Sequence, residues 1–198
     1  KDAEEVRSKI TDYMSSNESI KKKMMASEKE LDSFAEFTPK EELFDKLVKT
    51  IYEYHPSTDI SLIKKAYELA DSCHEGQLRK SGEPYICHPL CVAIILAELE
   101  LDKETIIAGI LHDVIEDTAC SPEEIKDIFG EEVLLLVDGV TKLTQLQYSK
   151  DKVDVQAENL RKMFLAMAKD IRVILIKLAD RLHNMRTMEY QSPAKQIE

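Results

Sequence analysis

The stretch that decides the fold is residues 106–117, which read IIAGILHDVIED. A run of apolar residues is followed at once by four ionisable side chains within six positions. If one helix continues through both halves, His112 lies one turn from Glu116 and Asp113 one turn from Asp117, so all four groups can reach one cavity. Imidazole and carboxylate together suit a first-row divalent metal, and further carboxylates can orient or deprotonate a water molecule. The alternative is a charged helix end on the surface, which the rest of the sequence disfavours.

The composition predicts an all-α protein. The 198 residues are 43% hydrophobic and include only five glycines and six prolines. Apolar residues recur at helical spacing over most of the chain, which favours packed helices over a sheet. We expect a helical domain over residues 39–198. Residues 1–38 are charged and poor in apolar side chains, so we expect a helical N-terminal extension that is stable only when docked on another surface.

The charge of the chain limits its partners. With 38 acidic and 27 basic residues, the formal net charge is -11. Such a protein repels nucleic acid and anionic membranes, so a phosphorylated substrate must be held by a local cluster of cations or by a metal. No apolar run reaches the length of a membrane span, and the N-terminus lacks the apolar core of a signal peptide. We therefore expect a soluble, cytoplasmic protein with no direct nucleic-acid or membrane binding.

Four cysteines are present without a Cys-x-x-Cys pair, and we expect reduced thiols. Cys91 lies in an apolar helical run, where cysteine usually serves as a small core residue. The alternative interpretation is a structural zinc site built from Cys73-His74 and from Cys87-His88 with Cys91.

Capping patterns divide the domain into helices. We expect Thr38 to cap a helix that begins at Pro39, and Pro89 to begin another helix after a loop over residues 76–88. A single helix is expected from Lys103 to Thr118. One further helix is expected to begin at Asp59 or Ser61, and another to begin at Ser121 and end at Gly130. Three more are expected over residues 131–140, 157–168 and 171–190, with a polar segment from Gly139 to about Val155.

Four candidate metal ligands come from three of these segments. His88 stands at a helix start, and His112 and Asp113 follow the apolar run. Asp180 lies within an apolar helix, where an inward-facing carboxylate must be paired or bind a metal. Two imidazoles and two carboxylates make a mononuclear site with open positions for water and substrate.

The order His…His-Asp…Asp is that of the HD phosphohydrolase superfamily. Longer motifs extend the likeness over roughly residues 40–198. The sequence resembles the hydrolase domain of the long RelA/SpoT homologues, which make and degrade the alarmones ppGpp and pppGpp. The motifs that carry this resemblance are RKSGEPY before His88, HDxxED from His112, DGVTKL from Asp138, AENLRKM from Ala157, and the run from Asp170 to Thr187.

The resemblance implies a role for each matching residue. The metal ligands would be His88, His112, Asp113 and Asp180, usually with Mn²⁺, and Glu116 and Asp117 would handle the attacking water. Arg79, Lys80 and Ser81 match the loop against the guanine base, and Asn184 and Thr187 match positions near the ribose and its phosphate. The implied reaction removes the 3′-diphosphate of guanosine tetra- or pentaphosphate, and the synthetase and regulatory domains would lie outside this fragment.

Three classes of function remain after this comparison of motifs. The first is the (p)ppGpp pyrophosphohydrolase. The second is another HD enzyme, such as a cyclic-nucleotide phosphodiesterase or a nucleotidase. The third is a non-catalytic regulatory or dimerisation module, and oligomerisation is left open. Lys142 and Arg181 are further candidate cations near the phosphates, and His183 is either a site residue or a buried structural histidine.

Overall fold

The computed structural model describes residues 38–147 and 170–190, and within them it confirms the all-α prediction. These residues contain no strand, only an isolated bridge between Leu78 and Pro84. The predicted N-terminal extension and the predicted helix over residues 157–168 lie outside the described residues. The described elements are α3 (Lys40–Tyr54), α4 (Ser61–Cys73), α5 (Cys87–Glu98), α6 (Lys103–Leu111), α7 (Val114–Asp117), α8 (Pro122–Phe129), α9 (Glu131–Gln147), α11 (Arg172–Arg186) and the 3₁₀ helix η2 (Met188–Tyr190).

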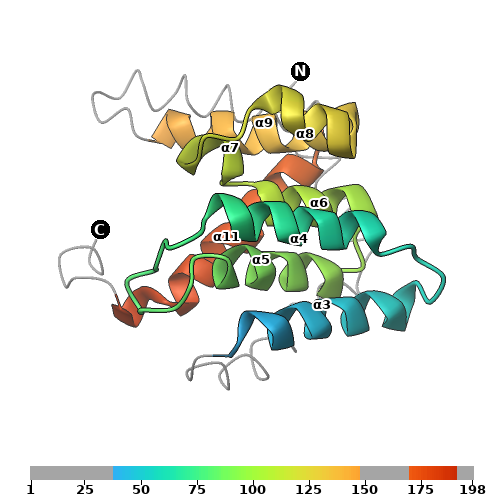
Figure 1. The fold of residues 1–198 in the computed structure, drawn as a ribbon, viewed down its shortest axis with the longest axis horizontal. Coiled ribbons are helices and arrows are strands. Elements are labelled where there is room, and N and C mark those ends of the chain that lie inside the picture. The colour runs from blue at the N-terminus through green and yellow to red at the C-terminus, as the bar shows by residue number, and fades with distance from the viewer. Residues whose placement is uncertain (1–37, 148–169, 191–198) are drawn as a thin grey trace, which may run out of the picture.

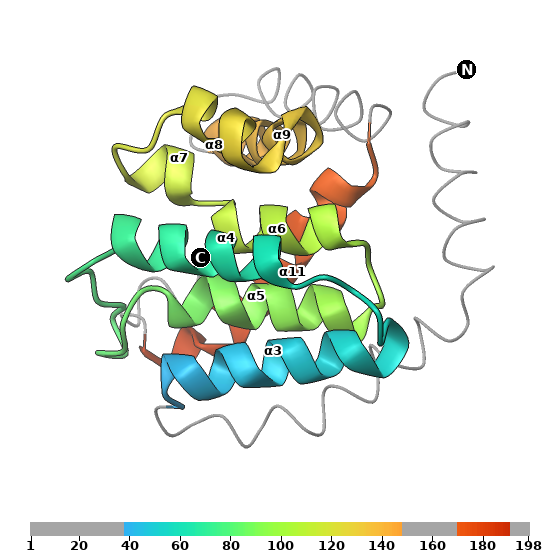
Figure 2. The same cartoon turned by 45° about the vertical axis from the view of Figure 1, so that its right-hand side comes forward.

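Helix α5 is the centre of the domain. It packs against α3, α6 and α11, and nearly all of its residues are buried. Figures 1 and 2 show α3 on one side of α5, with α4 and α6 on the other side and α7, α8 and α9 beyond them. A helix that is apolar all round must be covered on every side, which explains why α5 lacks a polar face.

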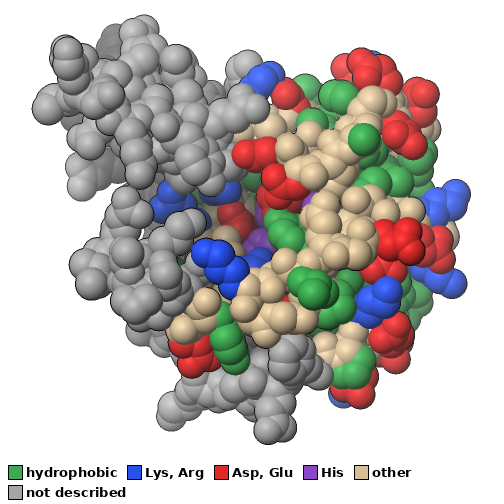
Figure 3. Space-filling view, turned by 60° about the vertical axis from the view of Figure 1, so that its left-hand side comes forward, with side chains coloured by type: hydrophobic (Ala, Val, Ile, Leu, Met, Phe, Trp, Pro, Cys, Tyr) green, Lys and Arg blue, Asp and Glu red, His purple; other side chains and the backbone are tan. Residues whose placement is uncertain are grey.

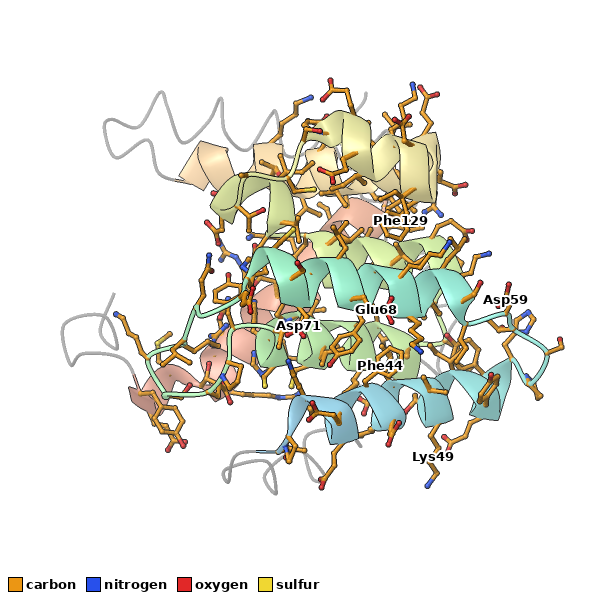
Figure 4. All side chains as sticks on the ribbon, viewed as in Figure 1. Phe44, Lys49, Asp59, Glu68, Asp71 and Phe129 are labelled. Carbon is orange, nitrogen blue, oxygen red and sulfur yellow. The ribbon has the colours of Figure 1, made fainter. Side chains whose placement is uncertain are left out.

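Helix α3 covers α5 with a single apolar face. Leu43, Leu47 and Ile51 are buried at helical spacing. The Phe44 ring stacks on Tyr67 of α4 with centroids 4.7 Å apart. Figure 4 shows Phe44 on the side of α3 that faces the other helices, whereas Lys49 points away from them. The amphipathic pattern therefore fixes which face of α3 meets the core.

The start of α3 differs from the prediction by one residue. Pro39 takes the N-cap position and no side chain caps the helix, so Thr38 is not the cap. The Pro39 carbonyl accepts the first helical hydrogen bond, from the Leu43 amide at 3.1 Å. A separate ion pair, between Lys40 and Asp71 at 2.7 Å, ties this end of α3 to α4.

The single helix predicted over residues 103–118 is wrong, because the chain breaks at His112 and Asp113 into α6 and α7. In a continuous helix, the Gly109 carbonyl would accept from the Asp113 amide. The His112 Nδ1 atom instead lies 2.8 Å from the Gly109 oxygen. The imidazole thus contacts the last turn of α6 at the break, and α7 starts at Val114.

Helix α8 follows its predicted caps. The Ser121 hydroxyl accepts a hydrogen bond from the Glu124 amide, and Gly130 ends the helix with a φ of 92°. Positive φ is readily available to glycine alone among the amino acids, so this residue fits the stop.

Helix α9 is longer than predicted. It runs to Gln147, so residues 139–147 are helical where we expected the polar segment to begin. A Cβ atom at Gly139 would lie 2.8 Å from Val173 Cγ2. Gly139 is therefore a point of close approach between α9 and α11, and it does not interrupt the helix.

The loop before α5 ends two residues earlier than predicted. The helix begins at Cys87, so Pro89 is its third residue, and both Pro89 and His88 are buried. His88 thus lies in the first turn of the central helix. Among the helices of residues 38–147 and 170–190, none has the length and apolar character needed to cross a bilayer.

Candidate functional site

Three segments of the chain meet around His88, His112 and Asp180. One ligand-type atom from each of these side chains lies within 4.8 Å of the others, and all three residues are buried. His88 Nε2 is 3.2 Å from Asp180 Oδ1, and His112 Nε2 is 3.9 Å from the same oxygen. They come from α5, the end of α6 and α11, which pack against one another. The packing of these helices therefore gathers three of the four predicted ligands.

Asp113 completes the cluster from the break between α6 and α7. Its Oδ2 atom lies 3.1 Å from His112 Nε2 and 3.8 Å from His88 Nε2. The broken helix turns the Asp113 carboxylate toward both imidazoles. Asp113 therefore faces both imidazoles, but the close group of potential ligand atoms consists of His88, His112 and Asp180 without it.

The donor set fits a divalent first-row ion. Two ligands that bind the same ion at about 2.1 Å lie roughly 3–4.2 Å apart, and the distances above fall in or near this range. The His112 Nε2 atom is buried and makes no hydrogen bond of regular geometry, although Asp113 Oδ2 lies 3.1 Å away. A buried nitrogen whose hydrogen bonding is incomplete is suited to accept a ligand. Since His112 Nδ1 is 2.8 Å from the Gly109 oxygen, the ring can keep Nε2 as the coordinating atom.

The pKa values of the two imidazoles are shifted in opposite directions. Burial lowers the pKa of His88 to about 4. Burial also disfavours charge on His112, but the carboxylates of Asp113 and Asp180 outweigh it and raise its pKa to about 9. Burial would raise the pKa of both Asp113 and Asp180, yet the neighbouring imidazoles hold their pKa values well below the usual range. Both carboxylates are therefore charged at neutral pH and available to a cation.

Asp180 is held by two further side chains on its own helix. Lys177 donates to Oδ2 at 2.7 Å, and the Asn184 amide donates to Oδ1 at 2.6 Å. The three residues are spaced so that one face of α11 carries them toward the cluster. This support leaves Oδ1 directed at the imidazoles.

The acidic pair Glu116 and Asp117 lies on α7, and both residues are exposed. Partial desolvation and the charges of Asp113 and Asp117 raise the pKa of Glu116. Asp117 Oδ2 lies 3.2 Å from the Tyr85 hydroxyl, which also contacts Asp113. The pair is thus at the solvent side of the cluster, where a water molecule can reach it.

Three of the predicted substrate residues meet between the loop before α5 and the end of α11. Arg79 donates to Asn184 Oδ1 at 2.8 Å and lies 3.4 Å from Thr187 Oγ1. Because Asn184 also donates to Asp180, a chain of hydrogen bonds joins Arg79 to the candidate metal ligands. Lys80 is exposed in the same loop, and Ser81 Oγ is buried with no hydrogen-bond partner.

Figure 3 shows how these groups present themselves at the surface. Histidine side chains are visible at the bottom of a recess, with acidic and basic side chains around it. Basic side chains therefore lie next to acidic ones at this recess, although the chain as a whole is acidic.

Two residues of the site have no role in the sequence-based prediction: Tyr85 and Lys177. For His183 that prediction has two alternatives, a site residue or a buried structural histidine. Tyr85 lies three positions before His88, and Lys177 and His183 lie three before and three after Asp180. The structure places the Nδ1 atom of His183 2.8 Å from His88 Nδ1. Helical spacing from Asp180 was the only signal that could have found Lys177 and His183.

The other candidates fall elsewhere. Lys142 pairs with Asp138 at 2.5 Å on the exposed side of α9, and Arg181 is exposed. The four cysteines are free thiols. Within the described part of the chain, the single group of three potential ligands contains no cysteine, so the zinc alternative gains no support there.

A known domain family and several known proteins are similar to this chain. Residues 66–198 match the family described as HD domain. The GTP pyrophosphokinase of Myxococcus xanthus is 57% identical over 149 residues, covering 74% of this chain and 20% of that protein. The bifunctional (p)ppGpp synthase/hydrolase SpoT of Escherichia coli K12 is 54% identical over 153 residues, covering 77% of this chain and 22% of that protein. This chain thus spans about a fifth of the length of these curated relatives.

One solved structure is also similar to this chain in its fold. A metazoan orthologue of SpoT, described as hydrolysing ppGpp, superimposes with a TM-score of 0.54 at 31% identity, covering 67% of this chain and 73% of that one. The chain therefore belongs to the HD domain family and, within it, to the RelA/SpoT homologues.

Proposed function

We propose that this domain is a Mn²⁺-dependent pyrophosphohydrolase that removes the 3′-diphosphate of guanosine 3′,5′-bis(diphosphate) and of its pentaphosphate form. The observation that carries the proposal is the convergence of His88, His112 and Asp180. Asp113 Oδ2 lies 3.1 Å from His112 Nε2, and Arg79 is linked to Asp180 through Asn184. Relatives named guanosine-3′,5′-bis(diphosphate) 3′-pyrophosphohydrolase, such as that of Vibrio cholerae at 53% identity over 153 residues, support the choice of substrate.

The ligand set would be His88 Nε2, His112 Nε2, Asp113 Oδ2 and Asp180 Oδ1. A divalent ion bound there supplies Lewis-acid polarisation of phosphoryl oxygen and makes water more acidic. Mn²⁺ accepts mixed imidazole and carboxylate ligands, so the donor set suits it.

The protein supplies the remaining chemistry through charge and position. Glu116, whose pKa is raised, or Asp117 accepts a proton from the attacking water. The oxygen of that water forms a bond to the phosphorus attached to O3′, and the bond between this phosphorus and O3′ breaks. Pyrophosphate leaves, and O3′ gains a proton, which yields GDP from the tetraphosphate and GTP from the pentaphosphate.

Arg79 and Lys80 would bind the substrate. Arg79 is already oriented by Asn184 and Thr187, so its guanidinium is fixed before substrate arrives. A preorganised cation loses little conformational freedom when it binds a charged ligand. We assign the loop over residues 79–81 to the nucleotide, with Asn184 and Thr187 beside the ribose.

The testing experiment incubates the purified chain, freed of metal by chelation and reloaded with Mn²⁺, with ppGpp, pppGpp, cyclic dinucleotides and deoxynucleoside triphosphates. Chromatography identifies both products. We expect GDP and pyrophosphate from ppGpp, GTP and pyrophosphate from pppGpp, and little turnover of the others. Hydrolysis of a cyclic dinucleotide or deoxynucleotide in preference to ppGpp would replace the proposal with another HD activity.

Site variants separate metal binding from substrate binding. His112→Ala and Asp113→Ala should abolish release of pyrophosphate while the far-UV circular dichroism stays that of a helical protein. Arg79→Ala should weaken binding of the guanine nucleotide while Mn²⁺ affinity changes less than threefold. Lys64→Ala, an exposed lysine paired with Glu68, is the matched control for loss of one cation. Equal loss of nucleotide and metal affinity in Arg79→Ala would contradict its role.

A further inference from the structure

Tyr85 joins the candidate metal ligands to the acidic pair on α7. Its hydroxyl donates to Asp113 Oδ2 at 2.7 Å and lies 3.2 Å from Asp117 Oδ2. The tyrosine precedes these carboxylates by 28 and 32 residues, so only the fold brings the three together. Asp113 Oδ2 is also the oxygen that faces both imidazoles. One hydroxyl therefore contacts both kinds of acidic group in the site.

The ring of Tyr85 is fixed independently of these carboxylates. It stacks on His74 with centroids 4.4 Å apart and planes at 25°. His74 is buried, and its Nδ1 atom lies 2.9 Å from Gln77 Oε1. The Tyr85 amide donates to the Gln77 carbonyl at 3.0 Å, and the ring meets His88 edge-on. With the ring held on two sides, the hydroxyl has a defined position before any ligand binds.

The hydroxyl keeps its proton at neutral pH, because a phenol ordinarily has a pKa of about 10. Because a neutral phenol has a single proton to donate, the shorter contact marks Asp113 as its main acceptor. A hydrogen bond to a charged acceptor is stronger than one between neutral groups.

The Asp113 carboxylate needs a hydrogen-bond donor to fix its orientation. It lies between the last residue of α6 and the first of α7, so no regular helix fixes its backbone on both sides. Asp180, by comparison, has Lys177 and Asn184 on its own helix. The described contacts provide Tyr85 as the outside donor that holds the Asp113 carboxylate in its orientation toward the two histidines.

We propose that Tyr85 is a positioning residue, whose hydroxyl holds Asp113 Oδ2 toward His88 and His112 and keeps Asp117 beside it. The inference rests on the proposed function of the cluster as a metal centre. Tyr85 acts through Asp113 on metal affinity and through Asp117 on the placement of the acid beside the attacking water. Removing the hydroxyl frees the Asp113 carboxylate to rotate, which costs metal affinity even though no ligand is lost.

The test compares Tyr85→Phe with Tyr54→Phe. The first variant keeps the ring that stacks on His74 and removes only the hydroxyl. The second removes the hydroxyl that donates to the Leu101 carbonyl at 3.0 Å, outside the site. Calorimetric titration of the metal-free proteins with Mn²⁺ should show a loss of about 10-fold or more in affinity for Tyr85→Phe, the usual effect of removing a group that supports a ligand. Tyr54→Phe should bind Mn²⁺ like the wild type.

Two further readouts distinguish positioning from a general structural effect. In an Asp113→Asn background, adding Tyr85→Phe should change Mn²⁺ affinity by less than about threefold, because residues that act through one another are not additive. At saturating Mn²⁺, Tyr85→Phe should lower kcat and leave KM for ppGpp within about twofold of the wild type, since the hydroxyl affects the acidic groups rather than substrate binding.

The outcomes of these measurements test the role of Tyr85 and the metal centre separately. Wild-type Mn²⁺ affinity in Tyr85→Phe, or a full additive loss in the Asp113→Asn background, would overturn the role of Tyr85 while leaving the metal centre in place. A wild-type protein that binds no Mn²⁺ but still hydrolyses ppGpp would overturn both this inference and the proposed metal centre. Unfolding temperatures of the metal-free variants show whether each is folded. If Tyr85→Phe is not folded, unaltered Mn²⁺ affinity in Asp113→Asn overturns the inference.

Discussion

The Nδ1 atoms of His88 and His183 lie 2.8 Å apart inside the domain, so one ring must donate to the other. His88 Nε2 faces Asp180 and Asp113, and it can bind a cation only if the His88 proton is on Nδ1. His183 Nδ1 must then be the acceptor. Burial, followed by the neighbouring positive groups, lowers the pKa of His183 to about 2, so the ring is neutral at neutral pH. A neutral ring has one nitrogen without a proton, and Nδ1 is that acceptor when the His183 proton is on Nε2.

His183 should therefore control metal affinity without touching the ion. We expect His183→Leu to weaken Mn²⁺ binding by about 10-fold, because His88 loses the acceptor that fixes its tautomer. His183→Gln can still offer an oxygen to His88 Nδ1 and should retain more of the affinity. Calorimetric titration measures both. His55→Gln, on an exposed histidine, is the control. Equal affinities in the Leu and Gln variants would contradict this role.

Metal binding should release a proton from His112. The raised pKa of His112, about 9, means that the metal-free ring is protonated on both nitrogens and positively charged at a pH well below 9. Coordination by Nε2 requires the deprotonated ring, so affinity should rise with pH from 7 toward 9, by up to about tenfold per unit, and then level off. Titrations at pH 7 in buffers of different ionisation enthalpy should report close to one released proton. A pH-independent affinity over this range would refute the expectation.

The acidic pair on α7 should affect turnover and spare the metal. Glu116→Gln and Asp117→Asn remove a proton acceptor at nearly constant size, and we expect kcat for ppGpp to fall by roughly 10²–10⁴-fold in the variant that loses the base. Neither residue is in the group around His88, His112 and Asp180. Mn²⁺ affinity should therefore stay within about threefold for Glu116→Gln. If both variants keep wild-type kcat, the base lies elsewhere.

Gly139→Ala should destabilise the fold although alanine is the better helix former. In an open helix the exchange gains about 1 kcal/mol. Here the new Cβ would lie 2.8 Å from Val173 Cγ2, and such overpacking typically costs about 1–3 kcal/mol. Urea unfolding should show a lower midpoint, and adding Val173→Ala should restore part of the loss. A raised midpoint in the single variant would show that α9 and α11 separate at little cost.

Local patterns predicted much of the secondary structure. Ser121 and Gly130 were recognised as the ends of α8, because a cap depends on residues within one turn of it. The end of α9 was not, because Gly139 and the polar residues after it resemble a helix stop. The contact of Gly139 with Val173, which explains this glycine, depends on another helix.

The sequence by itself determined the all-α class, the chemical types of the candidate ligands and their order along the chain, because composition, periodicity and caps are local properties. The tertiary structure alone decided that the helix breaks at His112 and Asp113. It also decided that the Tyr85 hydroxyl donates to Asp113, that His183 Nδ1 lies beside His88 Nδ1 and that Arg79 donates to Asn184. The last two contacts join residues 95 and 105 positions apart, and no local pattern encodes such a distance. They exist because α5, α6 and α11 must bury their apolar faces against one another, and that packing brings the polar groups to one point.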